Sequence, residues 1–447
     1  MQETDRTPRR PQRVAVLADS DTRWKWGVLT ARRLVEPAAR VDGYLLRGRA
    51  TPTPRQLDEA GVRADSLREV SAVEFLHTVG TSARDGDRYD VVVLALVGGG
   101  VQALLHGLGH AFGAGGPAAR RPAVVTGYVG VVYEKLADGL LLRHGADLVV
   151  ANSRYDARRF RAVYEGVGAD ASAVVEAALP FLAGDAYDPA ARAGRGPYTV
   201  TFAVQPSVPE SRRDRAYLLR RAVGHARLHP EREVLVKLRS RPGEHTTHIE
   251  EAPYQKLVGT LGPLPANCRL VYGHMGEVLD RTDLLVTVSS TAALESLHRG
   301  VPTAVLTDLG VREALGNHHF LGSGCLTSWD RLDAGEVPEP DPDWVAEQGV
   351  RTAGAYDAAR KRLTELTDPA TELPPLDPYY TATTAPGYLP GVLARHHLGR
   401  DGAPLPGAPA ATAEPGRLRR ALRHTARGAY RHGVQRVAPV IRRIGEL

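Results

Sequence analysis

The chain has 447 residues, 43% of them hydrophobic and 24% charged, and this ordinary globular composition excludes wholesale disorder, collagen and coiled coil. The net charge of +6 suggests a nucleic-acid partner, but residues 417–447 hold nine arginines and one acid, a charge of +8, which leaves −2 for the other residues. The basic character therefore belongs to the C-terminal segment, and no nucleic-acid partner is expected.

The cysteine content and the N-terminal residues indicate the compartment. The two cysteines, Cys268 and Cys325, cannot form a disulfide framework in a chain of this length, which favours the reducing cytoplasm. The polar residues 1–12 lack the apolar core of a secretory signal, and we expect them to be disordered. The most apolar run, residues 91–97, is much shorter than the ~20 residues that span a bilayer.

The first part of the chain alternates short apolar runs with helix-like stretches. The run Arg13–Ala18 predicts a buried parallel strand, because it is mostly apolar and ends in the polar loop 19–21. Further strands are predicted at 41–46, 90–97, 122–126 and 146–151, with helices at 25–35, 101–110, 133–142 and 153–164. This alternation predicts a doubly wound α/β domain.

A second series of the same kind begins after a stretch rich in Ala, Gly, Asp and Pro. Its strands are predicted at 198–204, 233–238, 269–272, 283–288 and 302–306, and its helices at 212–228 and 291–299. Two Rossmann-like doubly wound domains would face each other across a cleft, with ligands at the carboxyl ends of the strands. The expected segments are a disordered N-terminus 1–12, a first domain 13–180, a linker 181–197, a second domain 198–396, a flexible linker 397–416 and a tail 417–447.

The tail has the pattern of a basic amphipathic helix. Apolar residues recur at three- and four-residue steps from Leu418 to Ile444 and arginines fill most other positions, although Gly428, Gly433 and Pro439 weaken the helix. Such a helix can dock on an anionic membrane surface, here the inner face of the plasma membrane. The alternative is a solvated tail without a partner.

The strongest local signal for chemistry lies in residues 286–302. A strand ends, Ser289, Ser290 and Thr291 lead into a helix, and free backbone N–H groups with the helix dipole gather positive potential there. This arrangement suits a phosphate group, and it is equally consistent with a plain helix cap. Glu295, within the helix, could face a ribose or lie exposed on the surface.

A second signal follows the strand predicted at 233–238. Lys237, Arg239 and Arg241 stand near its end, and cations in such a position suit anion binding. His245 and His248 have a spacing that fits a metal, but no further ligand pair accompanies them, so no metal site is expected. A solvated polar loop is the alternative interpretation of the whole run.

Two more signals follow strands of the first series. Asp19 and Asp21 come after the strand 13–18, where a carboxylate can act as a general base or cap a helix. Trp24 and Trp26 could stack on a sugar or belong to the core. In the stretch 126–135, glycines at the turn after a strand permit close approach of a ligand. It is not a dinucleotide-binding fingerprint, and the chain has no Walker A motif.

The segment Ser289-Ser290-Thr291, with Glu295 and Gly300-Val301-Pro302, resembles the donor-binding helix of GT-B glycosyltransferases. It is especially similar to that of bacterial polysialyltransferases, Kdo transferases and CDP-glycerol phosphotransferases. Further segments resemble a bacterial family described only as glycosyltransferases, and the resemblance covers residues 14–326. These segments are 18–21, 25–27, 126–130, 237–248 and 306–324.

This resemblance implies a GT-B-like fold in which the first domain binds the acceptor and the second the donor. The implied nucleotide- and donor-binding residues are Lys237, Arg241, His274, Met275, Ser289, Ser290, Thr291 and Glu295. Asp19 would be the base for the acceptor hydroxyl. Polysialyltransferase-like enzymes carry a His-Pro pair where this chain has Arg239, so Arg239 or His248 would assist departure of the phosphate. The implied acceptor-side residues are Asp21, Trp24, Trp26, Gly127 and Glu134.

Together these observations predict a glycosyltransferase that moves a sugar from a nucleotide-activated donor to a hydroxyl of a cell-envelope glycan, without a metal or other cofactor. A CMP-linked acidic sugar is the favoured donor and a UDP-sugar the next. Two alternatives remain open: a nucleotide-sugar epimerase on the same fold, and a non-catalytic protein that binds glycan or serves as a scaffold.

Overall fold

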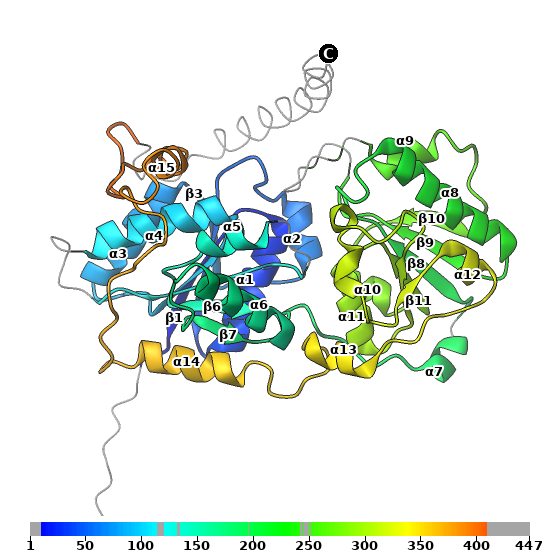
Figure 1. Ribbon diagram of the computed structural model, residues 1–447, viewed down its shortest axis with the longest axis horizontal. Helices are drawn as coiled ribbons and strands as arrows, with labels where there is room; N and C mark the ends of the chain where they lie inside the picture. Colours follow the sequence, from blue (N-terminus) through cyan, green and yellow to red (C-terminus); the bar gives the residue numbers. More distant parts are fainter. Residues whose placement is uncertain are drawn as a thin grey trace, which may run out of the picture.

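The computed structural model describes residues 10–113, 120–131, 135–194, 196–241, 244, 250 and 252–408. These residues form two α/β domains, shown on the left and right of Figure 1, each built on a parallel sheet. The expectation of two doubly wound domains is confirmed. The predicted amphipathic tail 417–447 lies outside the described residues.

The first domain holds a sheet of seven described strands in the order β3-β2-β1-β4-β5-β6-β7. The strands are β1 (Arg13–Ala18), β2 (Arg40–Leu46), β3 (Ser66–Val70), β4 (Val91–Ala95), β5 (Ala123–Gly127), β6 (Leu148–Ala151) and β7 (Val174–Glu176). The helices between them are α1 (Asp21–Leu34), α2 (Pro54–Ala60), α3 (Ala72–Arg84), α4 (Gly98–Phe112), α5 (Leu136–Leu141) and α6 (Arg154–Gly166). Alternate residues of β1 join two different apolar clusters, so both faces of this sheet are covered.

The second domain holds six described strands in the order β10-β9-β8-β11-β12-β13. They are β8 (Thr199–Ala203), β9 (Glu233–Lys237), β10 (Cys268–Val271), β11 (Leu284–Thr287), β12 (Thr303–Leu306) and β13 (Leu326–Thr327). Its helices are α7 (Pro189–Ala193), α8 (Arg212–Leu228), α9 (Tyr254–Val258), α10 (Met275–Leu279), α11 (Ala292–Arg299) and α12 (Trp329–Asp333), with 3-10 turns η1 (Glu313–Leu315) and η2 (Asn317–Phe320).

After the second domain the chain returns to the first. Helix α13 (Pro342–Glu347) leads to α14 (Asp357–Thr367), which packs on α1, β5, β6 and β7, and α15 (Leu389–Ala394) packs on α4. Figure 1 shows α14 below the first domain and α15 above it. The predicted boundary of the second domain at residue 396 therefore differs from the structure. The apolar residues of α14, Ala359, Leu363 and Leu366, are buried in a cluster that begins at the first sheet.

The strand orders place two ligand-binding positions opposite each other. The order of the first sheet reverses between β1 and β4, and that of the second between β8 and β11. In open parallel sheets, ligands bind in the crevice outside the carboxyl ends of the strands at such reversals. One apolar cluster continues from β1 and α1 into Leu294 and Leu297 of α11, which joins the two domains beside these strand ends.

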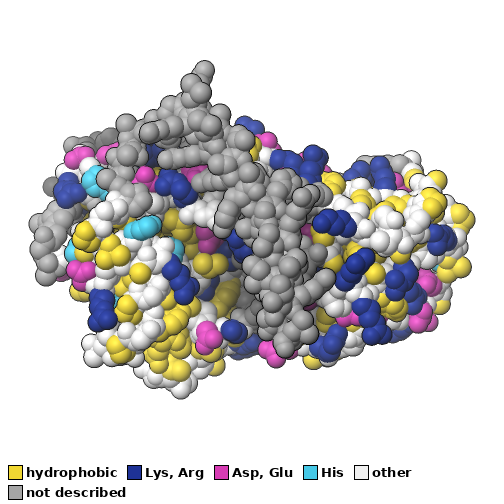
Figure 2. Space-filling view, turned by 90° about the horizontal axis from the view of Figure 1, so that it is seen from above, with side chains coloured by type: hydrophobic (Ala, Val, Ile, Leu, Met, Phe, Trp, Pro, Cys, Tyr) yellow, Lys and Arg dark blue, Asp and Glu magenta, His cyan; other side chains and the backbone are white. Residues whose placement is uncertain are grey.

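On the part of the second domain that Figure 2 shows in colour, Lys and Arg side chains are more frequent than Asp and Glu side chains, and apolar side chains lie between them. None of the described helices is long and apolar enough to cross a membrane.

Candidate functional site

A cavity of about 730 Å³ lies between the two domains, at the carboxyl ends of their strands. It brings together nine of the residues that the sequence assigned to a site, namely Asp21, Lys237, Arg239, His274, Met275, Ser289, Ser290, Thr291 and Glu295. Residues from both domains line it. We therefore regard this cavity as the candidate site.

The amino end of α11 forms one wall of the cavity. Ser290 Oγ accepts a hydrogen bond from Ala292 N at 3.2 Å, and Ser289 Oγ donates one to the carbonyl of Leu315 at 2.6 Å. The hydroxyl of Thr291 makes no hydrogen bond within the described residues and lines the cavity. Most backbone N–H groups at this helix end are already hydrogen-bonded. It therefore offers a phosphate oxygen the positive end of the helix dipole and the hydroxyl of Thr291.

Gln205, which follows β8, is a cavity residue that the sequence did not reveal. Its Oε1 accepts a hydrogen bond from Ser289 N at 3.0 Å, and its Nε2 donates to Ser289 Oγ at 3.2 Å. These two bonds fix the backbone where the chain enters α11. A lone glutamine after a strand carries no motif, so only the fold shows its partner 84 residues away.

The loop after β5 forms the opposite wall. A Cβ placed on Gly130 would lie 3.6 Å from Thr291 Oγ1, so this loop faces the amino end of α11 directly. Asn152 Nδ2 holds the loop by donating to the carbonyls of Tyr128 at 2.7 Å and Gly130 at 2.8 Å. The Asn152 amide oxygen accepts from Trp26 Nε1 at 3.4 Å.

Trp24 and Trp26 belong to the core. Their exposed fractions are 1% and 0%, and both lie in the apolar cluster beneath the first sheet. A buried indole offers no face to a sugar ring, so the structure corrects the expectation of a stacking platform at these two residues. Trp26 contributes to the site indirectly, through its bond to Asn152.

Gly127, the last residue of β5, is also a packing position. A Cβ there would lie 2.6 Å from the carbonyl oxygen of Val150 and 2.8 Å from the Trp26 ring. We expect Gly127→Ala to destabilise the fold by ~1–3 kcal/mol, because neither neighbour can move freely. Thermal unfolding should show a midpoint several degrees lower. In the control Gly109→Ala nothing lies within 4 Å of the new methyl group, so its midpoint should stay equal or rise. An unchanged midpoint for Gly127→Ala would contradict this packing.

Lys237 places a buried cation at the floor of the cavity. It is the last residue of β9, its side chain is 7% exposed, and its Nζ donates to the carbonyl of Leu238 at 2.7 Å. Burial lowers the pKa of Lys237 to about 8, although the nearby Glu59 carboxylate acts to raise it. Its ammonium group is therefore charged at neutral pH without a carboxylate in ion-pair distance among the described residues.

Arg239 crosses from the second domain to the first. Its Nη2 donates to Asp21 Oδ1 at 2.6 Å and to Thr22 Oγ1, both in the first turn of α1. Burial acts to raise the pKa of the Asp21 carboxyl, and the charge and hydrogen bond of Arg239 outweigh it, so the net pKa is lowered. Asp21 is thus held as a carboxylate.

Other contacts also join the domains around the cavity. Arg55 on α2 pairs with Glu244, and Glu59 on the same helix accepts a hydrogen bond from Gly273 N at 3.1 Å. Lys25 Nζ lies 3.9 Å from Glu295 Oε2. The described structure therefore has the two domains in contact around the cavity.

Glu295 and His274 line the cavity on the side of the second domain. Burial raises the pKa of Glu295, although the charges of Lys25, Arg299 and Lys237 act against it. Burial also lowers the pKa of His274, and the charge of Lys25 adds to this effect. A neutral imidazole at the start of α10 can flank a base or accept a hydrogen bond.

Asp19 differs from the other predicted residues in its surroundings. Its Oδ1 accepts from Arg23 Nη1 at 2.8 Å and its Oδ2 from Val97 N at 2.9 Å. It is absent from the described residues that line the cavity. With both oxygens bound to groups of the first domain, Asp19 is poorly placed to serve as a base.

Three further predicted residues lie off the cavity wall or outside the described residues. Arg241 is exposed and its guanidinium lies over the Tyr272 ring, 5.3 Å from the centroid. Glu134 and His248 fall outside the described residues, and their assignments stay predictions.

Arg143 is another residue that the sequence did not indicate. Its guanidinium is 4% exposed and donates to the carbonyls of Gly127, Gly139 and Leu96. It also lies 4.1 Å from the centroid of the Tyr128 ring. Arg143 thereby ties together the end of β5, helix α5 and the residue that follows β4, and it gives this wall of the cavity a fixed shape.

One described group of side chains has the composition of a metal site. His225, His229 and Asp333 offer ligand atoms within 4.8 Å of one another. His225 Nδ1 is 2.7 Å from Asp333 Oδ1, its Nε2 is 3.3 Å from Arg232 Nη1, and Asp333 Oδ2 accepts from Arg221 at 2.9 Å. Because two arginines already bond this group, we interpret it as a hydrogen-bonded clamp between α8 and α12.

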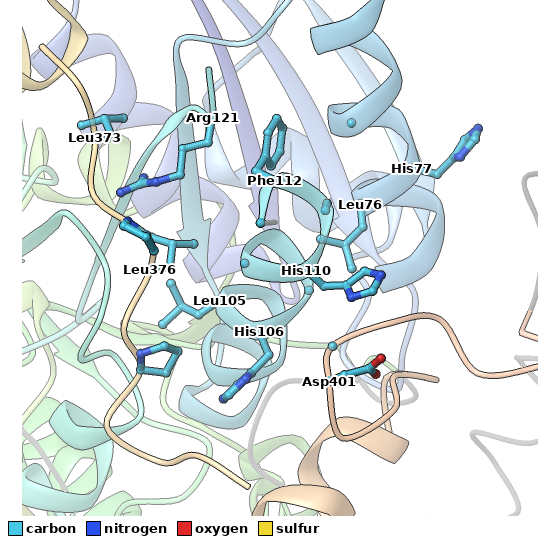
Figure 3. A pocket seen from close by; sticks show the side chains of 18 of the residues that line it. Leu76, His77, Leu105, His106, His110, Phe112, Arg121, Leu373, Leu376 and Asp401 are labelled. Atoms are coloured by element: carbon cyan, nitrogen blue, oxygen red, sulfur yellow. The ribbon is translucent and has the colours of Figure 1, made fainter. Parts of the chain in front are cut away.

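A larger cavity, of about 1630 Å³, lies on the first domain between α3, α4 and the returning chain (Figure 3). Its wall includes Leu76, Leu105 and Phe112, while His77 points away from it. Arg121 is bound to Asp147 and to the carbonyl of Pro374, and His106 Nε2 lies 2.9 Å from the Tyr380 carbonyl. These polar groups already have hydrogen-bond partners within the protein. Arg121 precedes β5 and so lies at the amino ends of the strands, whereas ligands bind at the carboxyl ends. We therefore do not place the site there.

The sequence of this chain matches a known protein family over most of its length. Residues 14–366 match the model of the family described as "Putative glycosyltransferase (DUF6716)". The chain belongs to this family. The match confirms the expected glycosyltransferase family and an enzyme of that class, and it extends beyond residue 326 to include most of α14. No curated protein matches the sequence.

The solved structures that match this chain share little sequence with it. One is a putative UDP-N-acetylglucosamine 2-epimerase from Listeria monocytogenes, with 12% identity, a TM-score of 0.48, and coverage of 80% of this chain and 95% of that one. Another is a UDP-glucosyltransferase from Polygonum tinctorium, with 14% identity, a TM-score of 0.46, and coverage of 81% and 94%. The spinosyn forosaminyltransferase SpnP has 14% identity, a TM-score of 0.45, and coverage of 80% and 99%.

Proposed function

We propose that this protein transfers a sugar from a nucleotide-activated donor to a hydroxyl group of a cell-envelope glycan. One observation carries the proposal: a single cavity joins the amino end of α11, with Ser290 and Thr291, to the cations Lys237 and Arg239. A transferase of this type must stabilise a phosphate that gains negative charge as the sugar leaves. The helix dipole and these two cations supply that stabilisation without a metal ion.

The two domains divide the substrates between them in this proposal. The second domain holds the donor, with its phosphates at Ser290 and Thr291 and its ribose near Glu295. The nucleotide base lies beside His274 and Met275. The first domain presents the acceptor from the side of Asp21 and the loop after β5, across the cavity from α11. This division is supported by the closeness of the two walls, since a Cβ placed on Gly130 would lie 3.6 Å from Thr291 Oγ1.

A CMP-linked acidic sugar remains the favoured donor, with a UDP-sugar next. The support is the resemblance of residues 286–302 to polysialyltransferases, together with the additional cation Lys25 in the cavity, which could meet a sugar carboxylate. Replacement of the His-Pro pair by Arg239 argues the other way. Thermal-shift measurements with CMP, CDP, UDP and GDP distinguish between these donors, because the correct nucleotide stabilises the folded chain by mass action.

Binding of the donor nucleotide should depend on pH through Lys237. The pKa of about 8 means that its ammonium is charged below that value and neutral above it. Affinity for a nucleotide should therefore fall as the pH rises through about 8. Isothermal titration calorimetry between pH 6 and 9 measures this, with Lys237→Met as the variant that loses the dependence. A wild-type affinity that stays flat to pH 9 would remove Lys237 from the phosphate site.

A turnover assay distinguishes sugar transfer from the two alternatives, a nucleotide-sugar epimerase and a non-catalytic scaffold. The full chain is incubated with a nucleotide sugar, with and without a cell-envelope glycan extract, and free nucleotide and sugar products are measured by NMR. Transfer predicts nucleotide release that requires the acceptor. Conversion of the nucleotide sugar without acceptor would indicate an epimerase, and binding of glycan without any conversion would indicate a scaffold.

The proposal also includes a contact between the tail 417–447 and a membrane surface. Its nine arginines and apolar periodicity suit an anionic surface, where each basic residue contributes about 1 kcal/mol. The full chain should co-sediment with liposomes of anionic lipid, and a chain ending at Gly416 should not. Equal sedimentation of both would show that the tail is not the contact.

A further inference from the structure

The contact between Asp21 and Arg239 joins a carboxylate of the first domain to a cation of the second, inside the candidate site. Asp21 is the first residue of α1 and Arg239 stands two residues after β9, and both line the cavity. Their side chains are 14% and 32% exposed and lie 2.6 Å apart, from Oδ1 to Nη2. The pair therefore faces the cavity, and a ligand entering it can compete for either partner.

Arg239 sets the basicity of Asp21. Burial acts to raise the pKa of Asp21, while the charge and the hydrogen bond of Arg239 lower it, and bonds from Thr22 lower it further. The other charged or titratable side chains that line the cavity include Arg23, Lys25, Glu59, Lys135, Asp138, Arg143, Lys237, His274, Glu295 and Glu313. If Arg239 moved to another anion, burial would remain and the pKa of Asp21 would rise.

We propose that Arg239 exchanges partners during the reaction: it holds Asp21 in the free enzyme and moves to the donor phosphate when the nucleotide sugar binds, which frees Asp21 to act as the base. This inference rests on the proposed function, because it requires a donor phosphate in the cavity. It assigns the base to Asp21 in place of Asp19. It also makes the base competent only after the donor is bound.

The step that follows is a single displacement at the anomeric carbon of the donor sugar. The acceptor oxygen forms a bond to that carbon while its O–H proton moves to the Asp21 carboxylate. The bond from the anomeric carbon to the phosphate oxygen breaks, and its electron pair stays on the phosphate, where Arg239 and Lys237 stabilise the charge. Asp21 later releases the proton to water. The product sugar linkage has the anomeric configuration opposite to that of the donor.

The position of the phosphate favours Asp21 over Glu59 and Glu295. In a displacement, the base must approach from the side opposite to the leaving group, so a phosphate on α11 requires a base from the first domain. Glu59 belongs to that domain, but Gly273 N and Arg55 already bind it. Glu295 is on α11 itself. Asp21 combines a first-domain position with a partner that the donor can remove.

Asp21→Asn should change binding and turnover in opposite directions. Without the competing carboxylate charge, Arg239 is free for the phosphate, and affinity for the donor nucleotide should rise roughly two- to fivefold. Sugar transfer should fall by about 10²- to 10⁴-fold, because no group then accepts the proton. The control Glu36→Gln replaces an exposed carboxylate just after α1 and should change neither. Near-normal transfer, or a loss of nucleotide affinity, would overturn the inference.

Proton uptake tests the exchange of partners itself. Nucleotide binding is measured by calorimetry near pH 6 in two buffers of different ionisation enthalpy. The wild-type chain should take up more protons on binding than Asp21→Asn, since only the wild type frees a carboxyl whose pKa rises. Equal uptake, or a transfer product with retained configuration, would overturn the exchange while leaving nucleotide binding intact. If no nucleotide binds at all, the proposed function itself fails.

Discussion

Replacing Lys237 with methionine should weaken binding of the donor nucleotide by about 10- to 100-fold, the expected effect of losing one charge-assisted hydrogen bond to a phosphate. Lys237 is the buried cation of the cavity, and methionine keeps nearly the same length without the charge. Because burial disfavours the ammonium, its removal should leave the folded state as stable as before, or more stable.

Calorimetry with the nucleotide selected by thermal shift measures this effect, and thermal unfolding reports the stability. The control Lys361→Met removes an exposed ammonium on α14 and should change neither quantity. A fall in both affinity and stability would indicate that Lys237 is a structural group. Unchanged affinity would place the donor phosphate elsewhere in the cavity.

Replacing Asn152 with alanine should lower both the free energy of unfolding and the nucleotide affinity. The amide is fully buried and satisfies the carbonyls of Tyr128 and Gly130, and its loss leaves two half-buried acceptors unpaired. Each unpaired group costs about 1–3 kcal/mol. The freed loop is the wall that faces Thr291, so we expect nucleotide affinity to fall as well.

Asn267→Ala is the matched control for this experiment. Asn267 Nδ2 donates to the carbonyls of Ala226, His229 and Arg232, and Asn267 does not line the cavity. The two variants should lose similar stability in chemical denaturation, but only Asn152→Ala should lose nucleotide affinity. An equal loss of affinity in both would show that the loop after β5 has no special part in binding.

Much of the fold could be predicted because buried parallel strands are almost wholly apolar. β1, β4 and β11 stand out in the sequence for that reason, and α8 was predicted with the bounds that the structure has. β3 escaped prediction because it lies at the edge of its sheet, where Leu67, Arg68 and Glu69 are exposed and no apolar run forms. The return of α14 to the first domain was equally hidden, since an amphipathic pattern does not say which domain its apolar face meets.

The candidate site, like the fold, could be predicted from the sequence only in part. Ser290, Thr291, Lys237 and Arg239 could be found because they lie at or just after the ends of predicted strands, and parallel strands bring their carboxyl ends to one edge. Gln205, Asn152 and Arg143 could not, because each acts on backbone groups that only the folded chain places beside it. The choice between core and site for Trp24 and Trp26 depended on burial, which sequence spacing does not determine.

The central claim is that the cavity between the domains binds the nucleotide of an activated sugar. Calorimetric titration of the full chain with CMP, CDP, UDP and GDP tests it most directly, with Ser290→Ala and Arg239→Ala titrated alongside. The account predicts that one nucleotide binds at least tenfold more tightly than the rest and that both variants weaken it by about tenfold or more. Absence of binding for all four nucleotides at millimolar concentration, or binding that both variants leave unchanged, would contradict it.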